Sequence, residues 1–224
     1  MEITPEHIRQ LFLYLPVFIL SLSVHEFAHA WTANKLGDPT PKLQGRLTLD
    51  PISHISVLGT LVCPIVGILS GFPFIAWAKP VQVDIAFFKK KRAYNAFVAL
   101  AGPLSNVLIA IFLAIVMGIL VRMLPTASVS GVEASPLMGA ALDMINFAIF
   151  MNIFLAFFNM VPLPPLDGAH VLQGFIGDKL AAQLDSVRSY TQLIFIAMAF
   201  QGAFAFLLPP TRFCVDFLMK TFVF

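Results

Sequence analysis

The chain has 224 residues, of which 58% are hydrophobic and only 12% are charged, and its mean hydropathy is +0.86. A soluble domain carries about 25% charged residues, so this composition excludes a water-facing surface over most of the chain and predicts a membrane protein. The net charge of +2 gives no indication of nucleic-acid binding, and two isolated cysteines, Cys63 and Cys214, exclude a disulfide framework.

In chain order, the apolar segments predict one all-α polytopic membrane domain over residues 1–224. The predicted spans cover residues 8–34, 93–121, 137–160 and 190–208. We expect a shorter helix at 167–176, after a proline-rich break, and a short amphipathic tail at 211–224 that lies at an interface. The first apolar stretch is not interpreted as a signal peptide, because Glu2 and Glu6 replace the usual basic cluster before it.

Basic residues predict the orientation in the cell membrane. Ten of the fourteen Lys and Arg residues fall in loops that we assign to the cytoplasmic side, and four fall opposite. Residues 55–78 are almost uncharged and contain several glycines and prolines. A single crossing there would place the basic run Lys89–Arg92 outside, so we expect a re-entrant segment that returns to the cytoplasmic side.

The sequence His25-Glu26-Phe27-Ala28-His29 is the strongest chemical motif. Residues four apart lie on one face of a helix, so both imidazoles can reach one zinc ion. Glu26 lies beside them, where it can accept a proton from the attacking water. Such a motif also occurs by chance in soluble proteins, but ionisable residues within an apolar span are costly and usually functional.

A catalytic zinc site usually has three protein ligands, so a third is expected from another segment. Asp167 is the best candidate, because it follows the proline-rich break 162–165 and precedes Gly168, which permits a turn. The alternative is that Asp167 only caps the short helix that follows it. Both roles are compatible.

These motifs resemble those of the site-2 protease family of intramembrane metalloproteases. Besides the His-Glu-x-x-His pair, the chain contains Gly45–Pro51, Trp77–Val81 and Ala101–Asn106, followed by Asn159-x-x-Pro-x-x-x-Leu-Asp-Gly168. This order of motifs is typical of compact prokaryotic members. The resemblance extends from about residue 15 to 176. Unlike many relatives, the chain leaves no room for a PDZ domain at 122–136 or for a nucleotide-sensing CBS domain at 211–224.

The resemblance implies a site and a substrate. His25, His29 and Asp167 would bind one Zn²⁺ per chain, Glu26 would be the general base, and Asn159 would hold the substrate backbone or the oxyanion. The substrate would be a transmembrane segment of another protein, cut near the cytoplasmic side in regulated intramembrane proteolysis. A small membrane-associated β-hairpin at 72–85, where Val81, Val83 and Ile85 alternate with polar residues, would hold the unwound substrate. An ordinary loop explains that pattern equally well.

Three further polar residues are weaker site candidates. His54 is either close to the metal or a histidine at the membrane surface, and His170 follows Asp167 by about one turn of the short helix. Asn106 either orients a ligand or bonds a neighbouring helix. The sequence does not indicate an oligomeric state.

Two other functions share part of this pattern. A metal-binding or metal-transport protein would not need Glu26 beside the metal, and a non-catalytic homologue that binds membrane helices would be expected to lack an intact ligand set. Both fit the residues less well than a zinc metalloendopeptidase.

Overall fold

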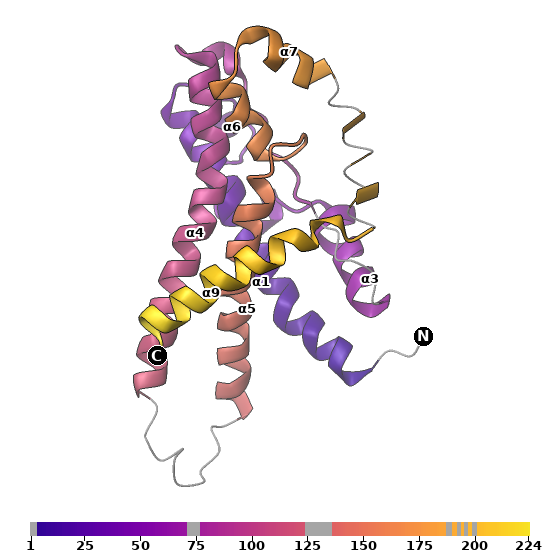
Figure 1. The fold of residues 1–224 in the computed structure, drawn as a ribbon, viewed down its shortest axis with the longest axis vertical. Helices are drawn as coiled ribbons and strands as arrows, with labels where there is room; N and C mark the ends of the chain where they lie inside the picture. Colours follow the sequence, from indigo (N-terminus) through magenta and orange to yellow (C-terminus); the bar gives the residue numbers. More distant parts are fainter. Residues whose placement is uncertain are drawn as a thin grey trace.

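The computed structural model describes residues 4–70, 77–123, 136–186, 190–191, 194, 197–198 and 201–224. Three long helices dominate it: α1 (Pro5–Lys35), α4 (Lys91–Met123) and α5 (Pro136–Asn159) (Figure 1). They contain 31, 33 and 24 residues, and a bilayer core requires about 20 helical residues. All three are apolar enough to cross a membrane, so the all-α polytopic fold is confirmed, and these helices coincide with the first three predicted spans.

The remaining described elements are short. They are α2 (Thr40–Leu43), the 3₁₀ turn η1 (Pro51–Ser53), the π-helix η2 (Val57–Val62), α3 (Cys63–Ser70), η3 (Ile85–Phe87), α6 (Asp167–Phe175), α7 (Asp178–Ser186), η5 (Ala203–Leu207) and α9 (Leu208–Phe222). The short helix predicted at 167–176 is therefore confirmed as α6. Of the predicted span at 190–208, residues 192–193, 195–196 and 199–200 lie outside the described residues, and residues 203–208 form η5 and the start of α9.

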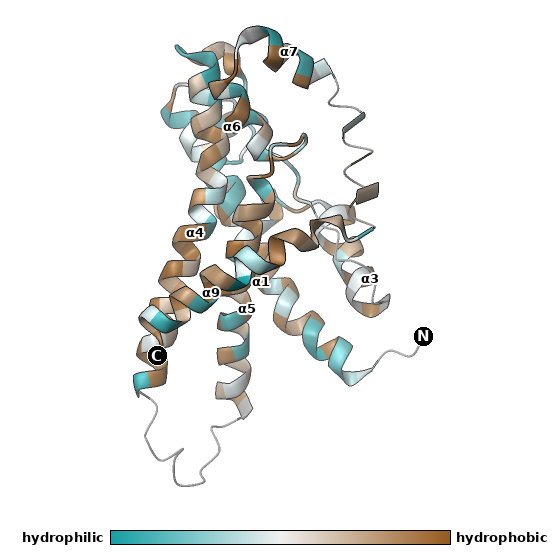
Figure 2. Ribbon diagram, in the orientation of Figure 1, coloured by the Kyte–Doolittle hydropathy of each residue, from teal (hydrophilic) through white to brown (hydrophobic). Residues whose placement is uncertain are grey.

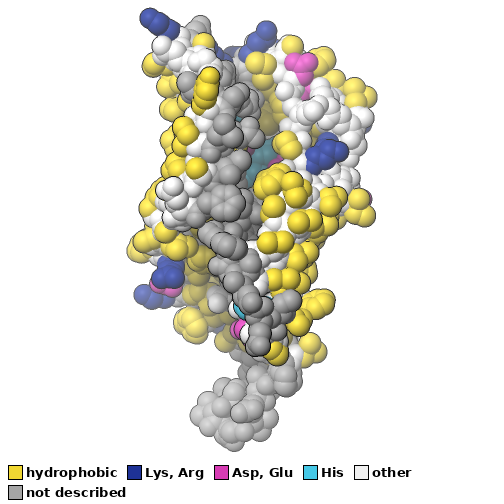
Figure 3. Space-filling model, turned by 90° about the vertical axis from the view of Figure 1, so that its right-hand side faces the viewer, with side chains coloured by type: hydrophobic (Ala, Val, Ile, Leu, Met, Phe, Trp, Pro, Cys, Tyr) yellow, Lys and Arg dark blue, Asp and Glu magenta, His cyan; other side chains and the backbone are white. Residues whose placement is uncertain are grey.

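Hydrophobic side chains lie on the outer surface of the helices as well as between the helices. Figure 2 shows hydrophobic residues along most of α4, α5 and α9, with hydrophilic residues gathered toward the end of the molecule that carries α7. On the face in Figure 3, hydrophobic side chains cover most of the described surface, and histidine is visible within a hollow. Such an apolar exterior suits a lipid environment.

The first helix has clear sequence signals at both ends. Its N-terminus is capped by the Thr4 hydroxyl, which accepts a hydrogen bond from the backbone N–H of His7, and Pro5 occupies the first turn. Beyond its C-terminus, Gly37 adopts a φ of +108°, which residues with a side chain rarely tolerate. Between these limits, α1 runs past α4 and α5, and α4 also contacts α6.

The two ends of the predicted re-entrant segment meet. The backbone N–H of Lys79 donates to the carbonyl oxygen of His54 at 2.9 Å, and that of Trp77 donates to the carbonyl oxygen of Gly59 at 3.1 Å. A side chain at position 59 would overlap the Trp77 ring, so only glycine permits this approach. Residues 71–76, at the turn of the predicted segment, lie outside the described residues.

The predicted β-hairpin at 72–85 is not supported, because residues 77–84 form no strand and Ile85–Phe87 form η3. The physical reason lies at Asp84. Its carboxylate accepts from the N–H of Ala86 at 2.9 Å and caps η3, while its own N–H donates to Asp38 at 2.8 Å. Side-chain caps therefore hold the backbone groups that a strand ladder would use.

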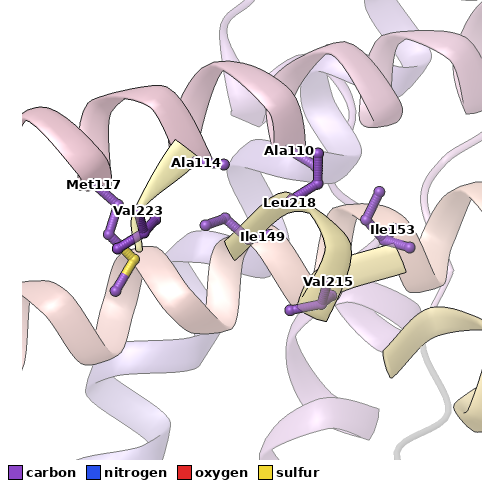
Figure 4. Close-up of a cluster of buried hydrophobic side chains, with 8 residues drawn as sticks. All are labelled: Ala110, Ala114, Met117, Ile149, Ile153, Val215, Leu218 and Val223. Carbon is purple, nitrogen blue, oxygen red and sulfur yellow. The ribbon is translucent and has the colours of Figure 1, made fainter. Parts of the chain in front are cut away.

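The helix α9 packs obliquely across α4 and α5 (Figure 1), although an interfacial position was expected for residues 211–224. Figure 4 shows the contact, which we call the apolar cluster. Its buried members are Ala110, Ala114, Met117, Ile149, Ile153, Val215, Leu218 and Val223. The Arg122 guanidinium donates to the carbonyl oxygen of Phe222 at 2.9 Å and joins the ends of α4 and α9.

Candidate metal centre

Three potential ligand atoms converge where α1, α4 and α6 meet. His25 and His29 lie one turn apart in the second half of α1, and Asp167 is the first residue of α6. The two Nε2 atoms are 3.0 Å apart, and Asp167 Oδ2 lies 3.1 Å from the Nε2 of His25 and 3.2 Å from that of His29. Both histidines are buried, and the Asp167 side chain is 19% exposed.

The ring protons of both imidazoles point away from the position where the three potential ligand atoms converge. His25 Nδ1 lies 2.6 Å from the side-chain oxygen of Asn106, and His29 Nδ1 lies 2.7 Å from the backbone oxygen of Val98. Because these partners are acceptors, each neutral imidazole carries its proton on Nδ1 and a lone pair on Nε2. This arrangement of an outer acceptor behind each histidine is usual for metal ligands.

The converging atoms fit a zinc ion. Two imidazole lone pairs and a carboxylate oxygen repel one another, and buried Asp167 Oδ2 has no hydrogen-bond partner, so a bound cation would stabilise the group. Tetrahedral zinc with bonds of about 2.0–2.1 Å separates neighbouring ligand atoms by about 3.3 Å, close to the observed 3.0–3.2 Å. The two nitrogens and one oxygen are ligands that zinc accepts.

A glycine on α4 makes room for the histidines. A Cβ at position 102 would overlap the His29 imidazole and also approach His25. Pro103 follows inside the same helix, and His29 bonds the carbonyl oxygen of Val98 one turn earlier. The Ala101–Asn106 motif of the sequence is thus the part of α4 that packs directly against the metal centre.

The proline-rich break brings Asp167 to the site. Helix α5 ends at Asn159, and α6 begins only at Asp167 after a short irregular stretch. The N–H of Leu166 donates to the carbonyl oxygen of Leu163 at 2.9 Å and closes the turn. Gly168 lies so close to the backbone of Met160 that a side chain there would overlap it, so glycine is needed for the chain to fold back.

Glu26 is buried beside the ligands and has a backbone partner. Its Oε2 accepts a hydrogen bond of 3.0 Å from the N–H of Val81. The segment 77–84 therefore contacts the general-base candidate directly, although it forms no strand. A carboxylate beside three candidate metal ligands can move a proton to or from a group bound there.

Comparison with known proteins identifies the family. The sequence profile of peptidase family M50 matches residues 13–201, most of the chain. The chain belongs to peptidase family M50. It is 35% identical over 197 residues to the protein named "Putative zinc metalloprotease YwhC" of Bacillus subtilis, which covers 84% of each chain.

Other relatives of this M50 chain carry the same description. It is 28% identical over 193 residues to Rip2 of Mycolicibacterium smegmatis, covering 83% of this chain and 68% of the relative. It is 40% identical over 80 residues to MJ0611 of Methanocaldococcus jannaschii, covering 35% of this chain and 34% of the relative. No solved structure matches the chain.

Three other residues predicted for the site, Asn159, His54 and His170, have hydrogen-bond partners outside the converging group. Asn159 donates to the carbonyl oxygen of Leu155 on its own helix at 3.0 Å. His54 is buried, and its Nε2 lies 2.9 Å from the carbonyl oxygen of Thr48, while its Nδ1 has no hydrogen-bond partner. His170 contacts Asn95 at 3.3 Å and Gln173 at 3.1 Å.

Two residues that the sequence did not single out, Ser21 and Asn152, join the predicted candidate Asn106 behind His25. Asn106 also donates to Asn152 Oδ1 at 2.8 Å, and Asn152 donates to the Ser21 hydroxyl at 2.9 Å. We call Ser21, Asn106 and Asn152, which come from α1, α4 and α5, the amide network; all three are buried. An asparagine in the apolar run of α5 was the available signal for Asn152.

Proposed function

We propose that this M50 protein is an intramembrane zinc metalloendopeptidase that hydrolyses peptide bonds in transmembrane segments, with one zinc per chain. The observation that carries the proposal is the convergence of His25, His29 and Asp167. The two histidines and the buried Glu26 lie on α1, a helix long and apolar enough to span a membrane. The names of its M50 relatives as zinc metalloproteases support the choice of metal.

Each residue is assigned one task. His25, His29 and Asp167 hold the zinc, which when bound polarises the scissile carbonyl and lowers the pKa of water. Glu26 accepts the proton of the attacking water and returns it to the leaving amine. Asn159, at the end of α5, turns its amide from Leu155 toward the substrate carbonyl and stabilises the developing negative charge.

The substrate must be unwound before it is cut. A peptide bond within a helix is shielded by its own hydrogen bonds, and backbone groups freed in lipid need new partners. We infer that residues 77–84, which reach Glu26 through Val81, supply such partners to an extended substrate. Cleavage would then depend on how easily the substrate helix unwinds, as in regulated intramembrane proteolysis.

We also propose that the metal centre faces the cytoplasmic side of the cell membrane, with residues 55–78 re-entrant. The uneven distribution of basic residues supports this orientation, as does the hydrogen bond that joins Lys79 to His54. Cysteines placed at 89–92 and in the loop 122–136, in a chain lacking Cys63 and Cys214, should react with reagents on opposite sides. Labelling of 89–92 from outside would refute the proposed orientation.

The function is tested with purified protein and a model transmembrane substrate. Wild type should contain about one zinc per chain and cleave the substrate, whereas Glu26→Gln should retain zinc and lose cleavage, because a neutral amide cannot accept the proton. A Glu26→Gln protein with full activity would refute the assignment of the base. A wild type that binds zinc without cleaving any membrane substrate would favour a binding or transport function.

A further inference from the structure

The hydrogen bonds behind His25 form a buried chain that crosses three helices. Asn152 Nδ2 donates to the backbone oxygen of Ala148 at 2.8 Å, and Asn106 Nδ2 donates to Asn152 Oδ1 at 2.8 Å. The side-chain oxygen of Asn106 then faces His25 Nδ1 at 2.6 Å. Both asparagines are 0% exposed, so water cannot replace any partner.

Each link fixes the direction of the next one. The backbone oxygen of Ala148 can only accept, so the amide nitrogen of Asn152 must face it and the oxygen of Asn152 must face Asn106. That oxygen requires the amide nitrogen of Asn106, which leaves the oxygen of Asn106 toward His25. A flip of either amide would place two acceptors or two donors together in a buried site, which is costly.

We propose that Asn152 is a positioning residue that selects the metal-binding tautomer of His25 through Asn106. If the Asn106 amide flipped, its NH₂ group would face Nδ1 and favour the tautomer with the proton on Nε2, the atom that faces the metal position. Of the side chains that bond Asn152, Asn106 is the one that bonds His25, so Asn152 acts on the tautomer of His25 through the amide of Asn106. The inference rests on the proposed function only in treating His25 as a zinc ligand.

His29 provides an internal control for the tautomer of His25. Its Nδ1 faces the backbone oxygen of Val98, which cannot flip, so no side chain is needed to choose its tautomer. Loss of the amide network should therefore disturb His25 and leave the tautomer of His29 unchanged.

The competing explanation is that Asn152 merely joins α5 to its neighbours, as polar residues often do between membrane helices. A carboxylate at position 106 separates the two explanations, because both of its oxygens accept and no flip can occur. In an Asn106→Asp background, Asn152→Leu should cause no loss of zinc affinity, because the tautomer of His25 no longer depends on Asn152 and the leucine removes the contact between two acceptor oxygens that the aspartate creates. A purely structural contribution of Asn152 to helix packing would be lost in both backgrounds.

The experiment measures zinc affinity by chelator competition in full-length protein, without substrate. Loss of an outer partner of a metal-bound histidine typically costs 10–100-fold in affinity. Asn106→Leu should show a loss of about 10–100-fold and Asn152→Leu a loss of about 10-fold, whereas Asn106→Asp/Asn152→Leu should bind zinc at least as tightly as Asn106→Asp does. Thr211→Val, which removes a buried hydroxyl on α9 that donates to the carbonyl oxygen of Leu207, should bind zinc as wild type does.

A second readout reports the tautomer itself. In zinc-free protein with ¹⁵N-labelled histidine, the His25 ring should carry its proton on Nδ1 in wild type and show a mixture in Asn152→Leu, with His29 unchanged. Thr211→Val, which lies outside the amide network, should keep the wild-type tautomer of His25 as well as the wild-type zinc affinity.

Two results would overturn the inference. One is wild-type zinc affinity and an unchanged His25 tautomer in Asn152→Leu; the other is an equal loss of affinity for Asn152→Leu in both backgrounds. Because neither measurement uses a substrate, a wild type that binds zinc and cleaves nothing would refute the proposed function while leaving this inference standing. A wild type that cleaves the substrate, together with equal zinc affinities in all variants, would support the proposed function and refute this inference.

Discussion

Helices α4 and α5 are packed in two different ways along their lengths. Around Gly102 and Asn106, α4 meets the histidines of α1 through one glycine contact and directed, buried hydrogen bonds. From Ala110 to Met117, the same helix contacts α5 and α9 only through the apolar cluster (Figure 4). The first region fixes positions, and the second fills space.

The difference matters because the surrounding solvent is lipid. Apolar side chains gain little by leaving lipid for a protein interior, so the apolar cluster depends on close fit. Hydrogen bonds between buried amides and histidines have preferred directions, and no water is present to substitute for them. Substitutions near the histidines should therefore change zinc binding, and substitutions in the apolar cluster should change stability alone.

The largest expected effect comes from removing a ligand. His25→Ala, His29→Ala or Asp167→Ala should each reduce zinc to well below one per chain and abolish cleavage, because two protein ligands do not hold a catalytic zinc. Ile149→Ala, in the apolar cluster, should keep zinc while lowering the melting temperature. Metal analysis and thermal unfolding of the same preparations measure both effects, and full zinc in Asp167→Ala would remove Asp167 from the ligand set.

A pair of glycines on α4 compares the two regions directly. Gly102→Ala should weaken zinc binding by more than about tenfold, because its methyl group overlaps an imidazole. Gly118→Ala, whose methyl group would meet the backbone oxygen of Phe222, should lower the melting temperature and leave zinc affinity unchanged. Gly139→Ala has open space around the added methyl group and serves as the control for both.

The sequence predicted the parts of this site that follow from helix geometry. Residues four apart on a helix must share a face, so the pairing of His25 and His29 follows from their spacing alone. Asp167 was predictable because prolines end a helix and free the chain to turn. The bounds of α1, α4 and α5 followed from the length of apolar segments.

Other parts of the site and the fold have no comparable signal in the amino-acid sequence. Val81 contacts Glu26 through its backbone N–H, a group that every residue except proline has. The position of α9 was missed because side chains that face lipid and side chains that face protein are equally apolar. The alternation of Val81, Val83 and Ile85 favoured a strand, but the cap at Asp84 makes the chain turn.

A smaller effect is expected from the backbone contact to the general base. Val81→Pro removes the N–H that donates to Glu26 and should lower the cleavage rate by about tenfold or more, since a hydrogen bond to a charged group contributes about 1.5–3 kcal/mol. Zinc content should stay at the wild-type level. Val81→Ala retains the N–H and should be nearly as active as wild type; equal activity of both variants would show that Glu26 is held by other contacts.

The smallest effect should come from a charged pair at the far end of α1 and α5. Arg9 and Asp143 are joined at 2.6 Å, but their side chains are 52% and 56% exposed. Exposed ion pairs contribute about 0–1 kcal/mol and weaken with salt. A double-mutant cycle with Arg9→Gln and Asp143→Asn, followed by thermal unfolding at low and high salt, should therefore give a coupling free energy below about 1 kcal/mol. Zinc affinity should not change, because no hydrogen bond in the amide network involves either residue. A large coupling with altered zinc affinity would mean that the two ends of α5 act as one rigid unit, and the separation between a region that fixes positions and a region that fills space would then fail.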